Sequence, residues 1–341
     1  MKTNVLIPTA AAVFAAAYVV CIKIRRLRDA LEDEQSRKNR LALQLMSHRN
    51  QGMHSEASIE RGRSFTPRAS DVFVVTYPKC GTTWVTQICH ALRTNASMEF
   101  GEITEVCPWD ILALDCKQDL DADHVASPRV WKSHEAWGHV AKGGKYIYVA
   151  RNPLDAFFSF YKFLPSFTGL QPGDIDTEAF AAAIFAGASV SGQIWDHFLG
   201  WYEQRHDANV LWVFFEDLAS DLPAEVKRIA RFMGVDATPT LLNKAARVSS
   251  FESMASKANK HHYDDHFIRK HIAAGMRLPA DATHEVTKVN QGKVGASKRV
   301  IPPALKARLD AKCSRPSSPG PRAAPTIPRA FCAKVRAERK N

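Results

Sequence analysis

The sequence of 341 residues lacks the cysteine patterns of a disulfide framework or a zinc site. Its seven cysteines are an odd number, and they form no CxxC pair and no dense cluster. We therefore expect free thiols in a reducing compartment, packed as small apolar residues. His261, His262 and His266 lie close together in the sequence, but no supporting carboxylate–cysteine pattern accompanies them. We expect no metal site.

The central region lacks the positive charge that a nucleic-acid-binding domain needs. The chain has a net charge of +11, but residues 1–70 hold 12 Lys and Arg against 6 Asp and Glu, and residues 311–341 hold 8 against 1. Residues 71–310 therefore hold 26 against 28, a net charge of −2. Because polyanions are bound by clustered Lys and Arg, we expect no nucleic-acid partner for this region.

Long hydrophobic runs are also scarce, and only one approaches the length of a membrane span. Residues 5–22 contain no charge, and four basic residues follow between positions 23 and 28. At 1.5 Å per residue this run nearly crosses a hydrocarbon core of about 30 Å. The basic flank indicates that the rest of the chain lies in the cytosol. We predict a single-pass membrane anchor at residues 1–28, with a cleaved targeting segment or a peripheral or soluble helix as alternatives.

A linker follows the predicted anchor, a tail ends the chain, and one central domain lies between them. Residues 29–64 are polar and charged, and we expect them to form a linker. Residues 313–341 contain five prolines between positions 316 and 328, mixed with Ser, Ala and Arg. This composition cannot bury enough apolar surface to fold, so we predict a disordered, basic tail. The remaining residues, 65–312, form the predicted catalytic domain.

The central domain alternates strand-like and helix-like patterns. Short β-branched or aromatic runs predict strands at residues 72–76, 129–133, 145–150 and 210–215. Helical spacing predicts helices at residues 84–93, 153–162 and 223–233. This alternation predicts an α/β fold with a parallel sheet and helices on both faces. Ligands bind such sheets where strands end and helices begin.

The first strand ends in a segment with the chemistry of an anion site. In Tyr77-Pro-Lys-Cys-Gly-Thr-Thr-Trp84, Gly81 lets the backbone approach an anion and Lys79 supplies a positive charge. Thr82 and Thr83 add hydroxyls and amides at the start of a helix. The GxxxxGK[ST] order of a nucleoside-triphosphate loop is missing, and no strand ends in an obvious metal-holding Asp. These two absences argue against a magnesium-dependent kinase, and an ordinary strand–helix turn is the remaining alternative.

Two further strand ends carry candidate functional residues. Arg151 follows the strand at 145–150, and Ser159 lies two turns along the next helix. An Arg at this position binds either a phosphate or a carboxylate. His134 ends the strand at 129–133, two residues after Lys132. With an ordinary pKa near 6.5 it suits general-base catalysis at neutral pH, although a lone His is more often structural.

The order of these motifs resembles the cytosolic-type sulfotransferase family. YPKCGTTW is followed by KSH, YVARNPLDAFFSFY, FFED, SSFESM and GKVGASK, and together they cover residues 65–310. The resemblance implies a P-loop-like fold that binds 3′-phosphoadenosine 5′-phosphosulfate (PAPS). It also implies in-line transfer of the sulfuryl group to a hydroxyl or amine of a small acceptor, without a metal. The resemblance implies a small-molecule partner, and it is compatible with a homodimer.

The resemblance assigns a role to each matching residue. The catalytic residues would be His134 as base, with Lys79 and Lys132 beside it. The donor-binding residues would be Lys79, Cys80, Gly81, Thr82, Thr83, Trp84, Arg151, Ser159, Phe215, Ser250 and Gly292. In this set, residues 79–83 hold the 5′-phosphosulfate, Trp84 stacks on adenine, and Arg151 and Ser159 bind the 3′-phosphate.

The sequence also departs from the family pattern. Asn290 and Gln291 stand where the family has Arg and Lys at the 3′-phosphate. Because each charge-assisted hydrogen bond is worth about 1.5–3 kcal/mol, a nucleotide-binding protein that has lost transfer is the main alternative. For the acceptor pocket we expect apolar walls, formed by Trp109, Phe157, Phe160, Tyr161 and Phe163.

Overall fold

A computed structural model describes residues 10–186, 191–279, 288–289, 292, 294–295, 297 and 301–313. The proline-rich tail from residue 314 onward lies outside these residues, as do Asn290 and Gln291. The predictions for the tail and for the altered 3′-phosphate motif therefore stay predictions.

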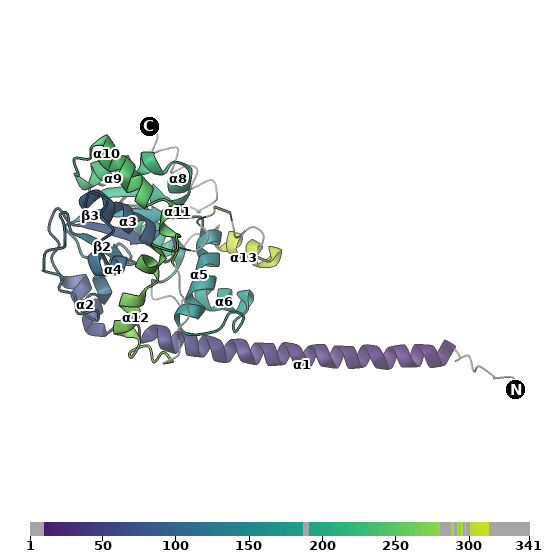
Figure 1. Cartoon of the computed structure of the whole chain (residues 1–341). Helices are drawn as coiled ribbons and strands as arrows, with labels where there is room; N and C mark the ends of the chain where they lie inside the picture. Colours follow the sequence, from purple (N-terminus) through teal and green to yellow (C-terminus); the bar gives the residue numbers. More distant parts are fainter. Residues whose placement is uncertain are drawn as a thin grey trace.

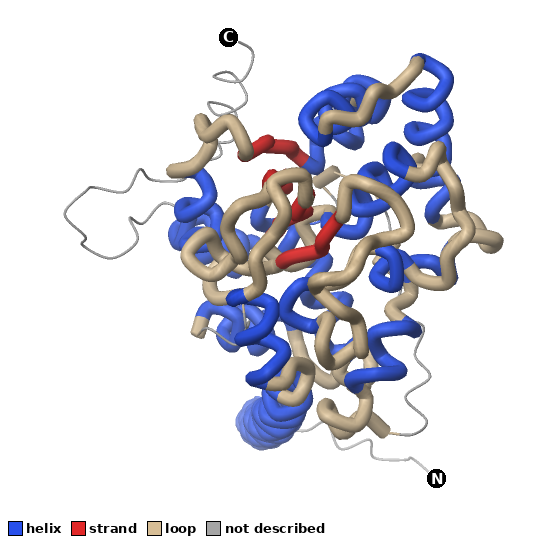
Figure 2. Tube along the Cα trace, turned by 90° about the vertical axis from the view of Figure 1, so that its left-hand side faces the viewer, coloured by secondary structure: helices blue, strands red, loops and turns tan. Residues whose placement is uncertain are grey.

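The centre of the fold is a four-stranded parallel sheet with the strand order β2-β1-β3-β4. The strands are β1 (Val72–Thr76), β2 (Val130–Ser133), β3 (Lys145–Ala150) and β4 (Val210–Phe214). Figure 2 shows them enclosed by helices and loops. The predicted parallel sheet is confirmed. β4 ends one residue earlier than expected because Phe215 begins a helix.

Helices cover both faces of this sheet, as the strand–helix alternation predicts. On one face Val74, Ile147 and Val213 pack against α3 (Thr82–Arg93), α9 (Leu222–Met233) and α10 (Pro239–Val248). On the other face Phe73, Tyr148 and Trp212 pack against α7 (Ile194–Tyr202). Successive residues of a strand point to opposite faces, so every strand contributes to both cores.

Of the remaining elements, α5 (Pro153–Phe167) follows the carboxyl end of β3. It begins with Asn152, whose side chain accepts a hydrogen bond from the Leu154 amide at 3.0 Å, and with Pro153 at its first position. The other helices are α2 (Glu56–Ser64), α4 (Ile103–Val106), α6 (Thr177–Phe185), α8 (Phe215–Ser220), α11 (Phe251–Met254), α12 (His266–Ile272) and α13 (Pro303–Cys313). Two short 3₁₀ helices are η1 (Asp110–Leu112) and η2 (Lys260–Tyr263).

α1 (Ala10–Gln51) is a helix of 42 residues that projects from the body of the molecule (Figure 1). None of the helices formed by the described residues is long and apolar enough to cross a membrane. The uncharged part of α1, residues 10–22, spans only about 20 Å before its first basic residue. The structure therefore does not support the predicted single-pass anchor, although residues 1–9 lie outside the described part.

The expected linker, residues 29–64, forms the end of α1 and all of α2, and both contact the domain. Asn39 Nδ2 donates to Asp176 Oδ2 at 2.6 Å, and Arg49 Nη1 donates to the Thr168 carbonyl at 2.7 Å. Met46 is buried in the core beside α5. These contacts make the second half of the segment part of the folded domain, which polar composition alone did not indicate.

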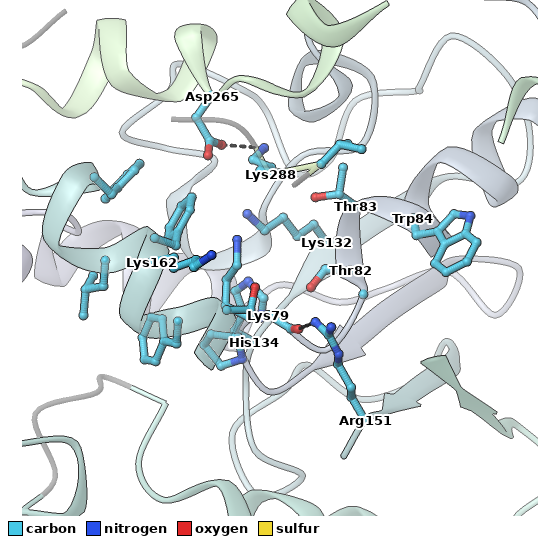
Figure 3. Close-up of a pocket in the computed structure, with 18 of the residues that line it drawn as sticks. Lys79, Thr82, Thr83, Trp84, Lys132, His134, Arg151, Lys162, Asp265 and Lys288 are labelled. Carbon is cyan, nitrogen blue, oxygen red and sulfur yellow. Dashed lines mark hydrogen bonds and ion pairs between the residues drawn. The ribbon is translucent and has the colours of Figure 1, made fainter. Parts of the chain in front are cut away.

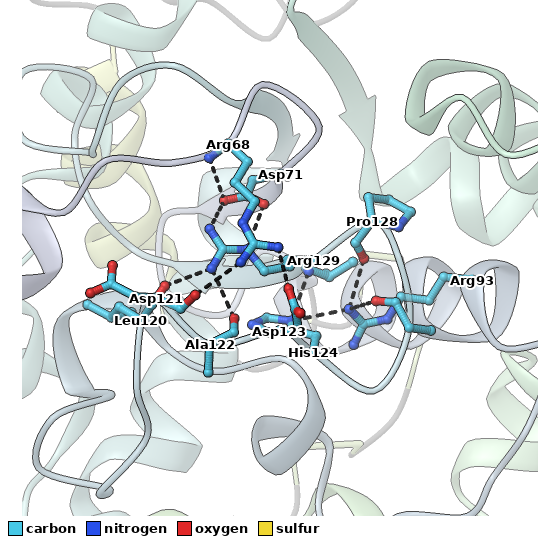
Figure 4. A network of polar contacts seen from close by, with 12 residues as sticks. Arg68, Asp71, Arg93, Leu120, Asp121, Ala122, Asp123, His124, Pro128 and Arg129 are labelled. Atoms are coloured by element: carbon cyan, nitrogen blue, oxygen red, sulfur yellow. Dashed lines mark hydrogen bonds and ion pairs between the residues drawn. The ribbon is translucent and has the colours of Figure 1, made fainter.

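A buried ion pair fixes the long segment between η1 and β2 to the sheet (Figure 4). Arg129 Nε and Nη2 donate to Asp71 at 2.9 and 2.5 Å, and its Nη1 donates to the Leu120 carbonyl at 2.8 Å. Arg93 on α3 donates to the Pro128 carbonyl at 3.0 Å. The two arginines thus attach this segment to both β1 and α3.

Candidate active site

A cavity of about 200 Å³ lies at the carboxyl ends of the parallel strands. Figure 3 shows that lysines from different segments converge on it. Most of the residues predicted from the sequence line this cavity, namely Lys79, Gly81, Thr82, Thr83, Trp84, Lys132, His134, Arg151, Ser159, Phe215 and Gly292. The tertiary structure therefore brings together residues that are up to 213 positions apart in the sequence.

The loop between β1 and α3 has the backbone shape of an anion cradle. Lys79 and Gly81 both adopt positive φ angles, 69° and 113°, and α3 begins directly after Gly81. A Cβ atom on Gly81 would lie 3.1 Å from Phe215 Cδ2. Glycine thus satisfies both the left-handed backbone and the tight packing. The first amides of α3 face the cavity end of the sheet, where the helix dipole favours an anion.

Two buried lysines face the cavity from this loop and from β2. Lys79 Nζ lies 3.7 Å from the centre of the Phe163 ring, and Lys132 Nζ lies 3.8 Å from the centre of the Trp109 ring. Burial lowers the pKa of Lys79 to about 7, and burial together with nearby Lys288 lowers that of Lys132 to about 8. Both ammonium groups are therefore costly to keep charged without an anion.

Lys288 is a third buried lysine, and it has carboxylate partners. It forms ion pairs with Asp265 and, at 2.9 Å, with Glu102. Burial opposes its charged form, but the two carboxylates outweigh burial and raise its pKa. Sequence reasoning missed Lys288 and Asp265, since no local motif links positions 23 residues apart. Lys288 differs from Lys79 and Lys132 because its charge is already compensated.

His134 is held in one orientation at the end of β2. Its Nδ1 lies 2.8 Å from the Thr76 carbonyl and 3.2 Å from Thr76 Oγ1, and its ring meets Trp109 edge-on at 4.9 Å. Burial, followed by the charge of Lys132, holds the pKa of His134 well below 6.5. The ring is therefore neutral. Because a carbonyl only accepts, Nδ1 carries the hydrogen and Nε2 carries the lone pair.

The backbone of His134 has a second support. His197 Nε2 donates to the His134 carbonyl at 3.2 Å, and Tyr148 Oη lies 3.1 Å from His197 Nδ1. Burial lowers the pKa of His197 to about 4, so it is neutral and serves as a structural hydrogen-bond donor. Sequence reasoning also missed His197.

Aromatic and guanidinium groups form the opposite end of the cavity. Trp84 Nε1 donates to the Ser249 carbonyl at 2.7 Å, and the Trp84 and Phe215 rings are 5.3 Å apart. The Arg151 guanidinium lies 4.0 Å from the centre of the Phe215 ring and donates to the Lys79 carbonyl at 2.9 Å. Its buried Nε atom has no partner among the described residues. This end therefore offers stacking surfaces and an unused donor, which suits a nucleotide.

Two of the predicted donor-binding side chains do not line the cavity. Cys80 is only 2% exposed and packs against Tyr77 and Ala156. Ser250 instead caps α11, where its Oγ accepts a hydrogen bond from the Ser253 amide at 3.1 Å. A contact of these residues with a ligand would therefore come from the backbone.

The cavity also has an apolar side. Of the expected wall residues, Trp109, Phe160 and Phe163 line it. Phe157 and Tyr161 pack on Phe180 instead, because their positions on α5 face away from the cavity. Sequence reasoning missed further apolar wall residues on α5, on α12 and after α1, which are Phe158, Leu164, Phe167, Ile268 and Met53. Asn50 and Met53 show that the end of α1 and the turn after it form part of this wall.

Metal ligands are not grouped in the part of the chain that the structure describes. No group of three or more His, Cys, Asp or Glu side chains within it is placed to hold a metal ion. Two of the three histidines noted in the sequence take other partners, since His262 Nδ1 lies 3.0 Å from the Gly101 carbonyl and His266 Nδ1 lies 2.6 Å from Asp264.

Comparison with known proteins places these features in a family. The family model described as "Sulfotransferase domain" matches residues 69–313. Amine sulfotransferase from Oryctolagus cuniculus is 30% identical over 235 residues, which cover 62% of this chain and 76% of that protein. The structure of mouse sulfotransferase SULT7A1 complexed with PAP is 25% identical, with a TM-score of 0.53, over 76% of this chain and 88% of that one.

A more distant structure supports the fold alone. Retinol dehydratase, in complex with androsterone and the inactive cofactor PAP, is 19% identical, with a TM-score of 0.58. The match covers 74% of this chain and 83% of that one.

Proposed function

Because the chain belongs to the sulfotransferase family of PAPS-dependent enzymes, we propose that it moves the sulfuryl group of PAPS to a hydroxyl or amine of a small acceptor, with His134 as the general base. One observation carries the choice of base. His134 is neutral, presents Nε2 as its basic nitrogen, and lines the same cavity as the anion cradle at residues 79–84. A base and a donor site within one cavity are what direct transfer requires.

The donor would lie along the cavity from the cradle to the aromatic end. The Gly81 turn and the first amides of α3 would hold the 5′-phosphosulfate, with Lys79 beside it. Trp84 and Phe215 would flank the adenine, and Arg151 and Ser159 would bind the 3′-phosphate. The mouse relative was crystallised with PAP, the product of such a donor, which supports this assignment.

The transfer step balances without a metal. Nε2 of His134 takes the proton of the acceptor hydroxyl or amine as the acceptor atom attacks sulfur. The bond from sulfur to the bridging oxygen breaks, its electron pair stays on that oxygen, and 3′-phosphoadenosine 5′-phosphate (PAP) leaves. Negative charge therefore grows on the bridging oxygen, where a buried cation is most effective.

Lys79 and Lys132 are suited to stabilise that charge. Both are buried, and burial lowers both pKa values toward neutral pH, whereas Lys288 forms ion pairs with two carboxylates. An anionic donor would raise both pKa values, so the two lysines would be fully charged when the bond breaks. Lys288 is already paired, and it would fix the position of Asp265 and Glu102 rather than serve the donor.

The acceptor would be a small molecule with an apolar body. Trp109, Phe160 and Phe163 line the cavity beside His134, together with Met53. These side chains bury apolar surface and leave His134 and the lysines as the polar groups nearest the reacting atom. The relative named amine sulfotransferase is consistent with an amine as well as a hydroxyl acceptor. Neither the described residues nor the comparisons support the membrane partner or the homodimer considered from the sequence.

The second candidate is a nucleotide-binding protein of this fold without transfer activity. It is favoured by Asn290 and Gln291, which replace the cationic pair of the family. It is opposed by the presence of Lys79, Lys132 and His134 in one cavity.

One experiment separates the two. The full chain and its His134→Ala variant are titrated with PAP by calorimetry and assayed with PAPS against 4-nitrophenol, a long-chain alcohol and a primary amine. We expect both proteins to bind PAP alike and the variant to lose at least about 100-fold in kcat, since a general base contributes roughly 10²–10⁴-fold.

Lys162→Met is a control, because this exposed lysine lines the cavity without contacting the base. PAP binding by the wild-type chain without transfer to any of the three acceptors would favour the second candidate. Full activity of His134→Ala would exclude His134 as the base.

A further inference from the structure

A buried threonine connects the donor cradle to the base. Thr76 ends β1, is fully buried, and does not line the cavity. Its Oγ1 lies 2.6 Å from Thr82 Oγ1 on α3 and 3.2 Å from Nδ1 of His134, the residue after β2. Its carbonyl lies 2.8 Å from the same Nδ1. A single residue therefore touches both the first residue of the cradle helix and the imidazole.

The chemistry of these groups sets the direction of the hydrogen bonds. The Thr76 carbonyl only accepts, so His134 Nδ1 carries the hydrogen and has no lone pair to offer. The Thr76 hydroxyl must then point its own hydrogen away from Nδ1. The partner in reach is Thr82 Oγ1 at 2.6 Å. The hydroxyl hydrogen of Thr82 is thereby directed away from Thr76, and Thr82 lines the cavity.

We infer that Thr76 is a positioning residue that couples occupation of the anion cradle to the state of the base, through the chain His134 Nδ1–H to Thr76 Oγ1 to Thr82 Oγ1 to the donor anion. The inference rests on the proposed function. An anion that accepts from Thr82 orients all the hydroxyls of the chain in one sense. That sense favours the tautomer with hydrogen on Nδ1, and it leaves the Nε2 lone pair for the acceptor.

The other described groups around His134 do not form hydrogen bonds with its ring, so a change at Thr82 reaches the ring through Thr76. The charged or titratable groups that face the imidazole are Lys132 on β2, Lys79 on the cradle loop and His197 on α7. His197 holds the main-chain carbonyl and not the ring. Trp109 contacts the ring through an edge-on aromatic contact. Only Thr76 contacts the ring through hydrogen bonds among the residues that the structure describes, so it alone transmits a change at Thr82.

The test replaces the hydroxyl and keeps the shape. Thr76→Val is close in volume, and Thr76→Ser retains the hydroxyl. We expect Thr76→Val to lower kcat about 10-fold while the PAPS KM stays within about 3-fold of wild type, and Thr76→Ser to restore kcat to within about 3-fold. Should Val not be accommodated, Thr76→Ala removes the same hydroxyl from a smaller side chain.

A second readout reports the coupling directly. In full-length protein labelled with ¹⁵N-histidine, PAP should change the chemical shift of the wild-type His134 Nδ1–H nitrogen, because the bound anion strengthens its hydrogen bond to Thr76 Oγ1. In Thr76→Val that change should fall to less than half. An equal change in both proteins, or a kcat for Thr76→Val within twofold of wild type, would overturn the coupling. The proposed function is tested separately, by the activity of His134→Ala. An inactive His134→Ala beside an unaffected Thr76→Val would reject only the coupling.

Discussion

Lys79 and Lys132 are buried lysines whose pKa values, about 7 and about 8, lie far below the ordinary value for lysine. Burial is the main cause of both shifts, and their Nζ atoms rest against aromatic rings. A site built in this way exchanges protons with solvent when an anion binds. The free protein loses these protons as the pH rises above 7, whereas the anion-bound protein retains them.

The affinity for PAP should therefore fall as the pH rises from 7 to 9. The free lysines must take up protons before they attract the anion, and we expect a decrease of about two to three orders of magnitude in the binding constant. Calorimetry at pH 7, 8 and 9, in two buffers of different ionisation enthalpy, measures the affinity and the proton uptake together. Lys79→Met should reduce the pH dependence and Lys162→Met should keep it. An affinity that is constant over this range would show that the lysines are charged before binding.

At the scale of elements, the chain directly after α1 packs against the segment after α12 through a close backbone contact between Gly52 and Gly275. A Cβ atom on Gly52 would lie 2.1 Å from the Gly275 carbonyl oxygen and 2.7 Å from its carbon. Arg277 Nη1 lies 3.2 Å from His48 Nε2 across the same junction. Since Met53 lines the cavity next to this contact, the junction positions one wall of the proposed acceptor site.

Gly52→Ala should push these two backbones apart. We expect it to destabilise the protein by about 1–3 kcal/mol, as overpacking does. We also expect it to raise the KM of the acceptor several-fold and leave PAP binding within twofold of wild type, because the donor cradle belongs to other elements. Thermal unfolding, calorimetry and steady-state kinetics measure the three effects.

Gly200→Ala is the matched control. Its Cβ would lie 3.9 Å from the nearest side chain, inside α7, where alanine is the better helix former. A Gly52→Ala variant as stable as Gly200→Ala, with an unchanged acceptor KM, would contradict the role of the junction.

At the scale of the whole molecule, stability depends on charges buried outside the cavity. Arg129 and Asp71 are 5% and 0% exposed, and the pair joins β1 to the segment before β2. Removing one partner leaves the other charge buried without compensation.

Arg129→Met should therefore lower the free energy of unfolding by about 3–5 kcal/mol. Arg61→Met, which breaks an exposed pair with Asp121, should cost less than about 1 kcal/mol. Urea unfolding followed by fluorescence compares the two variants with the wild type. Equal losses for both would show that burial does not set the strength of the Arg129 pair.

Local sequence patterns determined the parallel sheet, the helices on both faces and the place of the cavity at the ends of the strands. These features depend on neighbours along the chain, so the sequence alone predicts them. They include the strand and helix periods, the Gly81 turn and the helix start at Pro153. For the same reason the motif after each strand could be placed at one edge of the sheet before the structure was known. The family resemblance then supplied the roles that chemistry alone left open.

The tertiary structure decided the contacts between distant segments. The Lys288 pair with Asp265 and Glu102, the Met53 wall and the support of His134 by His197 and Thr76 all join distant parts of the chain. No local period encodes such contacts. Whether residues 29–64 form a linker or pack on the domain also depends on tertiary contacts. A polar segment packs on a domain when a few of its side chains form hydrogen bonds there. Burial, which sets the charge states of Lys79, Lys132 and His134, exists only once the chain has folded.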